Sequence, residues 1–241
     1  MSFEEAYRAC RDLLLDSYEV VEEVEKYRQD CRPKTVKVVL LAESHVHTTE
    51  KEFSKLLKKE YRHSDGTRCR YVRFVYCLGS SESQVLEQPE LAKRRRGQFW
   101  RVLYSCMHPI NSNSDFLPFD GVSAEERLNE KISLLGELKA NGIWLVDASI
   151  VGINGLDREA RDEIIQKCWE TSVGQTLRRL KDLKQIIVIG ETVHKALADE
   201  LKEIGVNVDK VPQPQARTPG GYLPYYRKIS DICQRYGVKS R

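Results

Sequence analysis

Three short apolar runs constrain the fold of this chain most. They read VKVVLLA at 36–42, IWLVD at 143–147 and IIVIG at 186–190. Their apolar residues follow one another almost without a break, which is typical of strands covered on both faces, as in a parallel sheet. Helix-length segments separate them, so strands alternate with helices along the chain. The sequence therefore predicts an α/β fold, with three layers (α/β/α) and a central, mainly parallel sheet of four or five strands.

The remaining elements follow from the same patterns. Helices are expected within 3–30, 50–62, 123–140, 157–184 and 191–204 and after residue 222, and further strands at 71–78 and 206–211. Residues 79–120 form a long, polar and irregular stretch, and loops of that length are usually functional or disordered. Because no repeat or clear linker interrupts the chain, we expect a single domain over 1–241. Residues 1–34 would form a helical extension packed on its core.

Composition limits the class of protein and its cofactors. The net charge of +3, from 39 basic and 36 acidic residues, is too small to indicate a nucleic-acid partner by itself. The seven cysteines are irregularly spaced without a CxxC pair, which favours reduced thiols over a zinc ribbon, an iron–sulfur cluster or a disulfide scaffold. No apolar run reaches 18 residues, and the acidic amphipathic start is unlike a signal peptide. We expect a cytoplasmic monomer (nucleoid-associated if prokaryotic) without metal, cofactor or membrane contact.

The end of the first predicted strand is rich in reactive side chains. Ligands of a parallel sheet bind outside the carboxyl ends of its strands. There, the first run leads into Glu43, Ser44, His45, Val46 and His47. A glutamate can orient a water molecule as a base, and a histidine can donate a hydrogen bond to a developing anion. A loop whose Ser and Thr cap the next helix, with a solvated His-x-His, accounts for the same residues. A His-x-His metal site is a weaker alternative.

The other strand ends carry less specific signals. Asp147 either caps a turn or reads a ligand, and Gly190 permits a tight turn into a helix whose N-terminus could face an anion. The Pro/Gly-rich loop at 211–222 is either a rigid connection or a probe that contacts nucleic acid. Its long polar side chains are Gln213, Gln215 and Arg217.

A basic run lies next to aromatic residues. Lys93, Arg94, Arg95 and Arg96 stand three residues before Phe99. Basic runs are usually solvated faces, but stackable aromatic rings beside one indicate a nucleic-acid partner.

Five segments resemble, in the same order, motifs of the uracil-DNA glycosylase superfamily, over about residues 35–230. The segment at 42–47 is similar to the first motif, of the type Gly-Gln-Asp-Pro-Tyr-His, and places Glu43 at its Gln or Glu and His47 at its last His. GQFWRVLY at 97–104 resembles Asn-Arg-Phe-Trp-Lys-Val-Ile-Tyr of the mismatch-specific branch. WLVD at 144–147 resembles the family's strand that ends in a base-reading Asn. IVIG at 187–190 resembles its strand that ends in Gly. VPQPQA at 211–216 resembles its His-Pro-Ser-Pro-Leu-Ser loop.

This chain departs from the family pattern at the residues that carry the chemistry. Six positions differ: Ser44 replaces the water-activating Asp or Asn, His45 the Pro, Val46 the pocket Tyr, Asp147 the base-reading Asn, Val211 the catalytic His and Gln215 the duplex-inserting Leu.

The resemblance implies a DNA glycosylase of base excision repair with rearranged motifs. It would hydrolyse the N-glycosidic bond of uracil, or of another deaminated or damaged base, flipped out of single- or double-stranded DNA. Glu43 and Ser44 would position the attacking water, and His45 or His47 would donate a hydrogen bond to the leaving base. The base pocket would contain Val46, Tyr76, Phe99 and Asp147, with Phe74 as a further stacking candidate. DNA would be contacted by Lys93, Arg94, Arg95, Arg96, Gln213, Gln215 and Arg217.

Asp147 bears on the choice of base. An ionised Asp only accepts hydrogen bonds, which favours a ring N–H or an exocyclic amine, whereas a protonated Asp could also donate one. We therefore expect a preference for bases other than plain uracil, or tolerance of several. Two alternatives stay open: a non-catalytic module that binds nucleic acid or a nucleotide on the same fold, and an unrelated α/β enzyme that acts on a phosphate ester through Glu43, His45 and His47.

Overall fold

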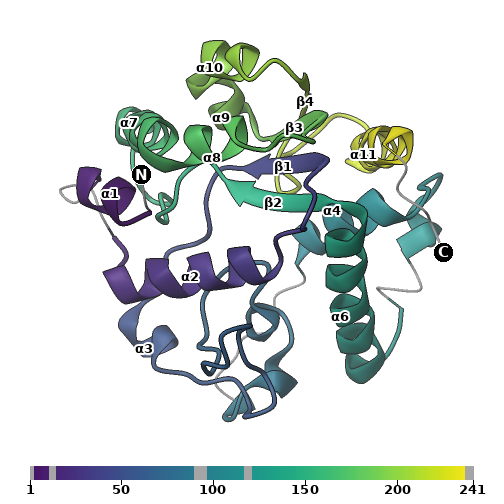
Figure 1. Ribbon diagram of the computed structural model, residues 1–241. Coiled ribbons are helices and arrows are strands. Elements are labelled where there is room, and N and C mark those ends of the chain that lie inside the picture. The colour runs from purple at the N-terminus through teal and green to yellow at the C-terminus, as the bar shows by residue number, and fades with distance from the viewer. Residues whose placement is uncertain (1–2, 11–14, 90–96, 117–120, 237–241) are drawn as a thin grey trace.

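The computed structural model describes residues 3–10, 15–89, 97–116 and 121–236 (Figure 1). Its centre is a four-stranded parallel sheet in the order β2-β1-β3-β4. The strands are β1 (Val38–Ala42), β2 (Ile143–Asp147), β3 (Gln185–Ile189) and β4 (Asn207–Val211). β1, β2 and β3 are buried along their whole length, whereas the edge strand β4 is partly exposed. Thus the three apolar runs and the run at 206–211 form strands as predicted.

Helices cover both faces of this sheet (Figure 1). Alternate strand residues divide into two hydrophobic clusters, so that Leu40 and Ile187 face one way and Leu41 and Val188 the other. The first cluster includes α4 (Gln98–Met107), α6 (Ala124–Asn141) and α11 (Leu223–Arg235). The second includes α1 (Phe3–Ala9), α7 (Arg158–Cys168), the π-helical turn η6 (Trp169–Val173), α8 (Gly174–Arg178), α9 (Glu191–Ala196) and α10 (Ala198–Glu203).

The N-terminal helices pack on the sheet rather than apart from it. α1 contacts α7 and η6, and α2 (Tyr18–Asp30) lies alongside β2. The indole N–H of Trp144 in β2 donates to the backbone carbonyl of Arg28 in α2, at 3.0 Å. This contact holds the last turn of α2 next to β2, and the side chain of Arg28 reaches Asp147 at the carboxyl end of that strand.

The boundaries of α6 are explained by local signals at the two ends of this helix. Ser123 and Glu126 form a capping box at its start, in which each side chain accepts a hydrogen bond from the other residue's backbone N–H. Gly142 ends it in the left-handed region, with a φ of 81°. A β-carbon at Gly142 would lie 2.7 Å from the carbonyl oxygen of Thr35, so the chain reaches β2 only because this residue has no side chain.

The predicted helix at 50–62 is wrong beyond its first turn. α3 spans only Glu50–Phe53, and the chain after it forms isolated antiparallel bridges, Leu56 with Arg70 and Arg62 with Arg68. The chain reverses around Gly66, which has a φ of 83°. Pairing with a distant segment has overridden the helical spacing of the apolar residues.

The predicted strand at 71–78 is also wrong. The segment keeps its alternation, with Val72, Phe74 and Tyr76 buried, but it forms no ladder with the sheet. Instead, the backbone N–H of Leu145 in β2 donates to the hydroxyl of Tyr76, at 2.8 Å. The Tyr76 side chain therefore accepts a hydrogen bond from the free edge of β2 in place of a fifth strand. The sheet of the described residues has four strands.

The predicted irregular stretch at 79–120 contains the ten-residue helix α4. Trp100, Leu103 and Met107 of α4 are buried, and α4 packs against α11 and α6. Three short 3₁₀ turns also lie in this region: η2 (Leu78–Ser80), η3 (Ser83–Val85) and η5 (Asn113–Phe116). Within the described ranges, no helix combines the length and the hydropathy that crossing a membrane requires.

Candidate functional site

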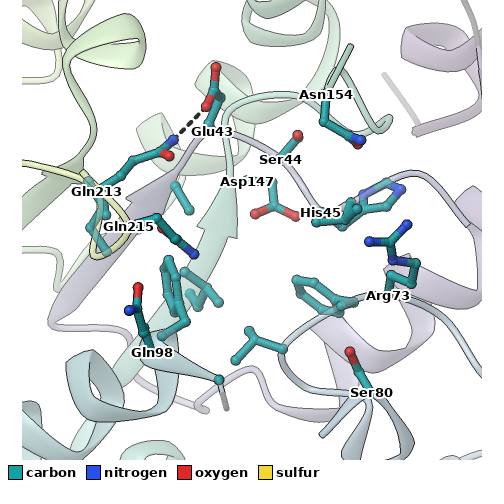
Figure 2. Close-up of a pocket in the computed structure, with 18 of the residues that line it drawn as sticks. Glu43, Ser44, His45, Arg73, Ser80, Gln98, Asp147, Asn154, Gln213 and Gln215 are labelled. Carbon is teal, nitrogen blue, oxygen red and sulfur yellow. Dashed lines mark hydrogen bonds between the residues drawn. The ribbon is translucent and has the colours of Figure 1, made fainter. Parts of the chain in front are cut away.

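A pocket of about 730 Å³ lies at the carboxyl edge of the sheet (Figure 2). The ends of β1, β2 and β3 and the loop after β4 contribute to its wall, as expected for a parallel sheet. The opposite wall comes from the segment around Phe74 and from the start of α4. The pocket thus combines aromatic surface with several polar side chains.

All five segments that carry the family resemblance contribute to this one pocket. Each is represented in the lining by at least one residue: Glu43, Phe99, Asp147, Ile189 and Gln213. Four of these segments are strand ends, which any parallel sheet brings to the same edge. The fifth, at the start of α4, is not a strand end, so its presence does not follow from the sheet alone.

The carboxylate of Glu43 has an amide as its hydrogen-bond donor and a guanidinium nearby. Its Oε2 accepts a hydrogen bond from the side-chain amide of Gln213 (Figure 2), and its Oε1 lies 3.5 Å from a guanidinium nitrogen of Arg161. The Glu43 side chain is 17% exposed. Gly190 allows the contact, because a β-carbon there would lie 3.1 Å from Cγ of Gln213. Gly190 also has a φ of 115°, a backbone conformation that favours glycine.

Asp147 is held by a charged partner. Its Oδ2 accepts a hydrogen bond from Nη2 of Arg28 at 2.9 Å, and both side chains are at least 96% buried. Burial alone would lower the pKa of the Arg28 guanidinium, but the carboxylates of Glu25 and Asp147 outweigh burial and raise it. The guanidinium also lies 5.5 Å from the centre of the Phe74 ring. In this ion pair Oδ2 of Asp147 is the acceptor and the guanidinium of Arg28 is the donor.

The two histidines after β1 are both anchored to Asp16. Nε2 of His45 lies 3.1 Å from Oδ2 of Asp16, and Nδ1 of His47 lies 2.7 Å from its Oδ1. The backbone N–H groups of Gly152 and Thr48 donate to the same carboxylate, at 2.6 and 3.2 Å. Burial raises the pKa of Asp16, but the hydrogen bonds from His45, Gly152 and His47 outweigh it and lower the pKa to about 2.

This anchoring changes what the histidines can do. His45 has a fully buried side chain, and its second ring nitrogen, Nδ1, has no hydrogen-bond partner among the described residues. When a neutral His45 donates its Nε2–H to Asp16, Nδ1 is an acceptor rather than a donor. His45 would therefore donate to a leaving base only as an imidazolium.

The other residues expected from the sequence are divided between the pocket and its surroundings. Ser44, Val46 and Gln215 line the pocket, whereas His47 and Arg217 are not part of its lining. Tyr76 does not line it either, because its ring packs behind Phe74, with ring centres 5.3 Å apart. The basic run at 93–96 lies outside the described residues.

Sequence reasoning missed four charged residues of this region. Asp16, Arg28, Arg73 and Arg161 hold the site residues or line the pocket. Arg73 had a local signal, because it interrupts an apolar segment. The others lie on helices or in a turn with no pattern that links them to a strand end.

No group of three or more His, Cys, Asp or Glu side chains in the described part of the chain is arranged to hold a metal ion. Searches of protein-family models, of curated proteins and of solved structures find no match to this chain.

Proposed function

We propose that the pocket binds a base flipped out of DNA and that the protein hydrolyses its N-glycosidic bond. The observation that carries this proposal is the convergence of all five resembling segments on one pocket, including the start of α4. The candidate substrates are DNA strands that contain uracil or another deaminated or damaged base. The repair of such bases is the function that the resemblance implies.

The pocket offers both surfaces that a flipped base requires. Phe74 and Phe99 present aromatic rings on which a base can stack, and the carboxylate of Asp147 can accept a hydrogen bond from its edge. Because Arg28 occupies Oδ2 of Asp147, Oδ1 is the oxygen left to face a ligand. This arrangement suits a base that presents a ring N–H or an exocyclic amine.

Glu43 is the residue best suited to assist hydrolysis. In the proposed reaction, a water oxygen bonds to the sugar C1′ as the C1′–N bond breaks, and that bond's electron pair leaves with the base. Glu43 would orient the water and take its proton, which then passes to the departing base. Arg73 and Arg161 also line the pocket and supply positive charge near the developing anion or a flanking phosphate.

A base-release assay tests this proposal. Single- and double-stranded oligonucleotides with uracil, hypoxanthine, xanthine or an alkylated base would be incubated with EDTA present, and abasic sites would be detected by alkaline cleavage. We expect release from at least one substrate, its loss in Glu43→Gln, and its retention in the control Glu159→Gln, which changes an exposed glutamate of α7. No release from any substrate would contradict the proposal.

A non-catalytic binding module is the second candidate. It is favoured by one observation: His45 and Asp147 are both committed to buried partners, Asp16 and Arg28. Glu43 is thus the one pocket carboxylate outside a fully buried ion pair in the described part of the chain. Salt-sensitive binding of the same oligonucleotides without base release would select this candidate.

A further inference from the structure

The basic charge of the described chain is concentrated in one segment. Residues 51–73 contain eight Lys or Arg and three Asp or Glu, a net charge of +5, whereas the whole chain has +3. The remainder of the chain is therefore slightly acidic. We call residues 51–73 the basic segment. Nothing in the proposed chemistry of the pocket requires this concentration of charge.

The carboxyl-terminal end of the basic segment lies at the pocket. Tyr71 and Arg73 line the pocket. Next to them, Nζ of Lys55 lies 5.2 Å from the ring centre of Tyr71, and the guanidinium of Arg70 lies 5.1 Å from that of Phe53. Two cation–ring pairs thus lie next to the residues of the segment that line the pocket. Such a combination is typical of surfaces that bind unpaired nucleic acid.

This surface is firmly attached to the body of the protein. The backbone N–H of Arg70 donates to Glu23 of α2 at 2.6 Å, and its carbonyl accepts from the hydroxyl of Tyr27 at 2.9 Å. His63 is buried between two carboxylates of α2, with Nε2 at 2.9 Å from Glu23 and Nδ1 at 2.6 Å from Asp30. A base or phosphate that contacts the segment therefore meets a surface fixed by these contacts.

Its acidic neighbours leave most of the positive charge on the surface. Glu23 and Asp30 face the buried His63, and Glu87 pairs with Arg68. Five exposed basic side chains remain on the segment without an ion pair among the described residues: Lys51, Lys58, Lys59, Arg62 and Arg70.

We propose that the basic segment binds the unpaired strand next to the base in the pocket. Its cations contact phosphates, while its rings and the Arg70 guanidinium offer stacking surfaces. This inference rests on the proposed function for the base in the pocket, but strand binding itself needs no damaged base. The partner is single-stranded DNA rather than an intact duplex, because stacking surfaces require exposed bases.

The test compares two triple variants that remove the same charge. Lys58→Ser/Lys59→Ser/Arg70→Ser changes the basic segment, and Arg179→Ser/Lys181→Ser/Lys184→Ser changes exposed residues near the amino end of β3, at the sheet edge opposite the pocket. Fluorescence anisotropy with unmodified single-stranded and duplex oligonucleotides, over a range of salt concentrations, gives the affinity and its salt dependence. Circular dichroism checks that both variants are folded.

We expect the variant in the basic segment to bind the single strand at least about 10-fold more weakly, with a salt slope smaller by about two, because each lost phosphate contact removes about 0.7 from the slope. The control variant should bind like the wild type. Unchanged affinity and slope would overturn the inference, as would equal losses in both variants or a loss confined to duplex DNA. Failure of the proposed function is separate: strand binding by this segment without base release would leave the inference standing.

Discussion

Glu43 and Asp147 occupy equivalent places in the fold but have different surroundings. β1 and β2 are paired so that Ala42 lies beside Asp147, and Glu43 follows directly. Asp147 is buried in an ion pair with Arg28. Glu43 is partly exposed, accepts a hydrogen bond from the neutral amide of Gln213 and lies 3.5 Å from the guanidinium of Arg161. A carboxylate in a buried ion pair is a fixed acceptor. The partners of the two carboxylates, rather than their strand positions, therefore distinguish them.

The largest expected effect is on stability when the charged partner of Asp147 is removed. Arg28→Met leaves a buried carboxylate without its cation, and breaking a buried pair in this way costs about 3–5 kcal/mol. The free energy of unfolding in urea measures the loss. Arg8→Met, an exposed change in α1, and Glu43→Gln should each cost less than about 1 kcal/mol. Similar losses in all three variants would remove the distinction between the two carboxylates.

The next effect separates the two carboxylates by activity. Glu43→Gln should lower the rate of base release by about 10²-fold or more, because the amide cannot take up a proton from water. Asp147→Asn should retain release but change the ratio of uracil to hypoxanthine released, because an amide both donates and accepts hydrogen bonds. Initial rates on matched oligonucleotides give both values. An unchanged ratio in Asp147→Asn would show that this residue does not select the base.

Asp16 extends the comparison to a third carboxylate, held by two histidines. Its pKa is lowered from 3.8 to about 2, so its contribution to stability is fully present above pH 3.8 and is lost as the pH falls toward 2. Asp16→Asn should cost about 2–3 kcal/mol at neutral pH, since hydrogen bonds to a charged group are weakened. Urea unfolding between pH 2 and 5 should show a shallower pH dependence in the variant. An equally steep dependence would assign the acid sensitivity to other groups.

The smallest expected effect concerns the neutral partner of Glu43. Gln213→Leu removes the amide that orients Glu43 but leaves its carboxylate, so base release should fall by about 10-fold or less. Stability should change by less than about 1 kcal/mol, because the side chain is only partly buried. Ala216→Ser, an exposed change in the same loop outside the pocket lining, is the control for loop shape. A loss as large as that in Glu43→Gln would make Gln213 a participant in the reaction rather than a positioning residue.

Two of the three failures of sequence-based prediction have a common cause. The segments at 50–62 and 71–78 have helical and alternating patterns, yet the first pairs with residues 68–70 and the second covers an edge of β2. α4 went unpredicted because it follows a basic run and begins without a side-chain cap. For the segments at 50–62 and 71–78, a contact with a distant segment, rather than local periodicity, decides the backbone conformation.

The sequence by itself determined the buried strands of the parallel sheet and the edge at which polar residues gather, because continuous apolar runs and strand ends are local features. It also identified Glu43, Asp147 and Gln213 as residues of that edge. Only the tertiary structure decided their partners: Arg28 for Asp147, Gln213 for Glu43 and Asp16 for both histidines. Ion pairs between residues far apart in the chain follow no periodicity, so they appear only once packing has brought the groups together.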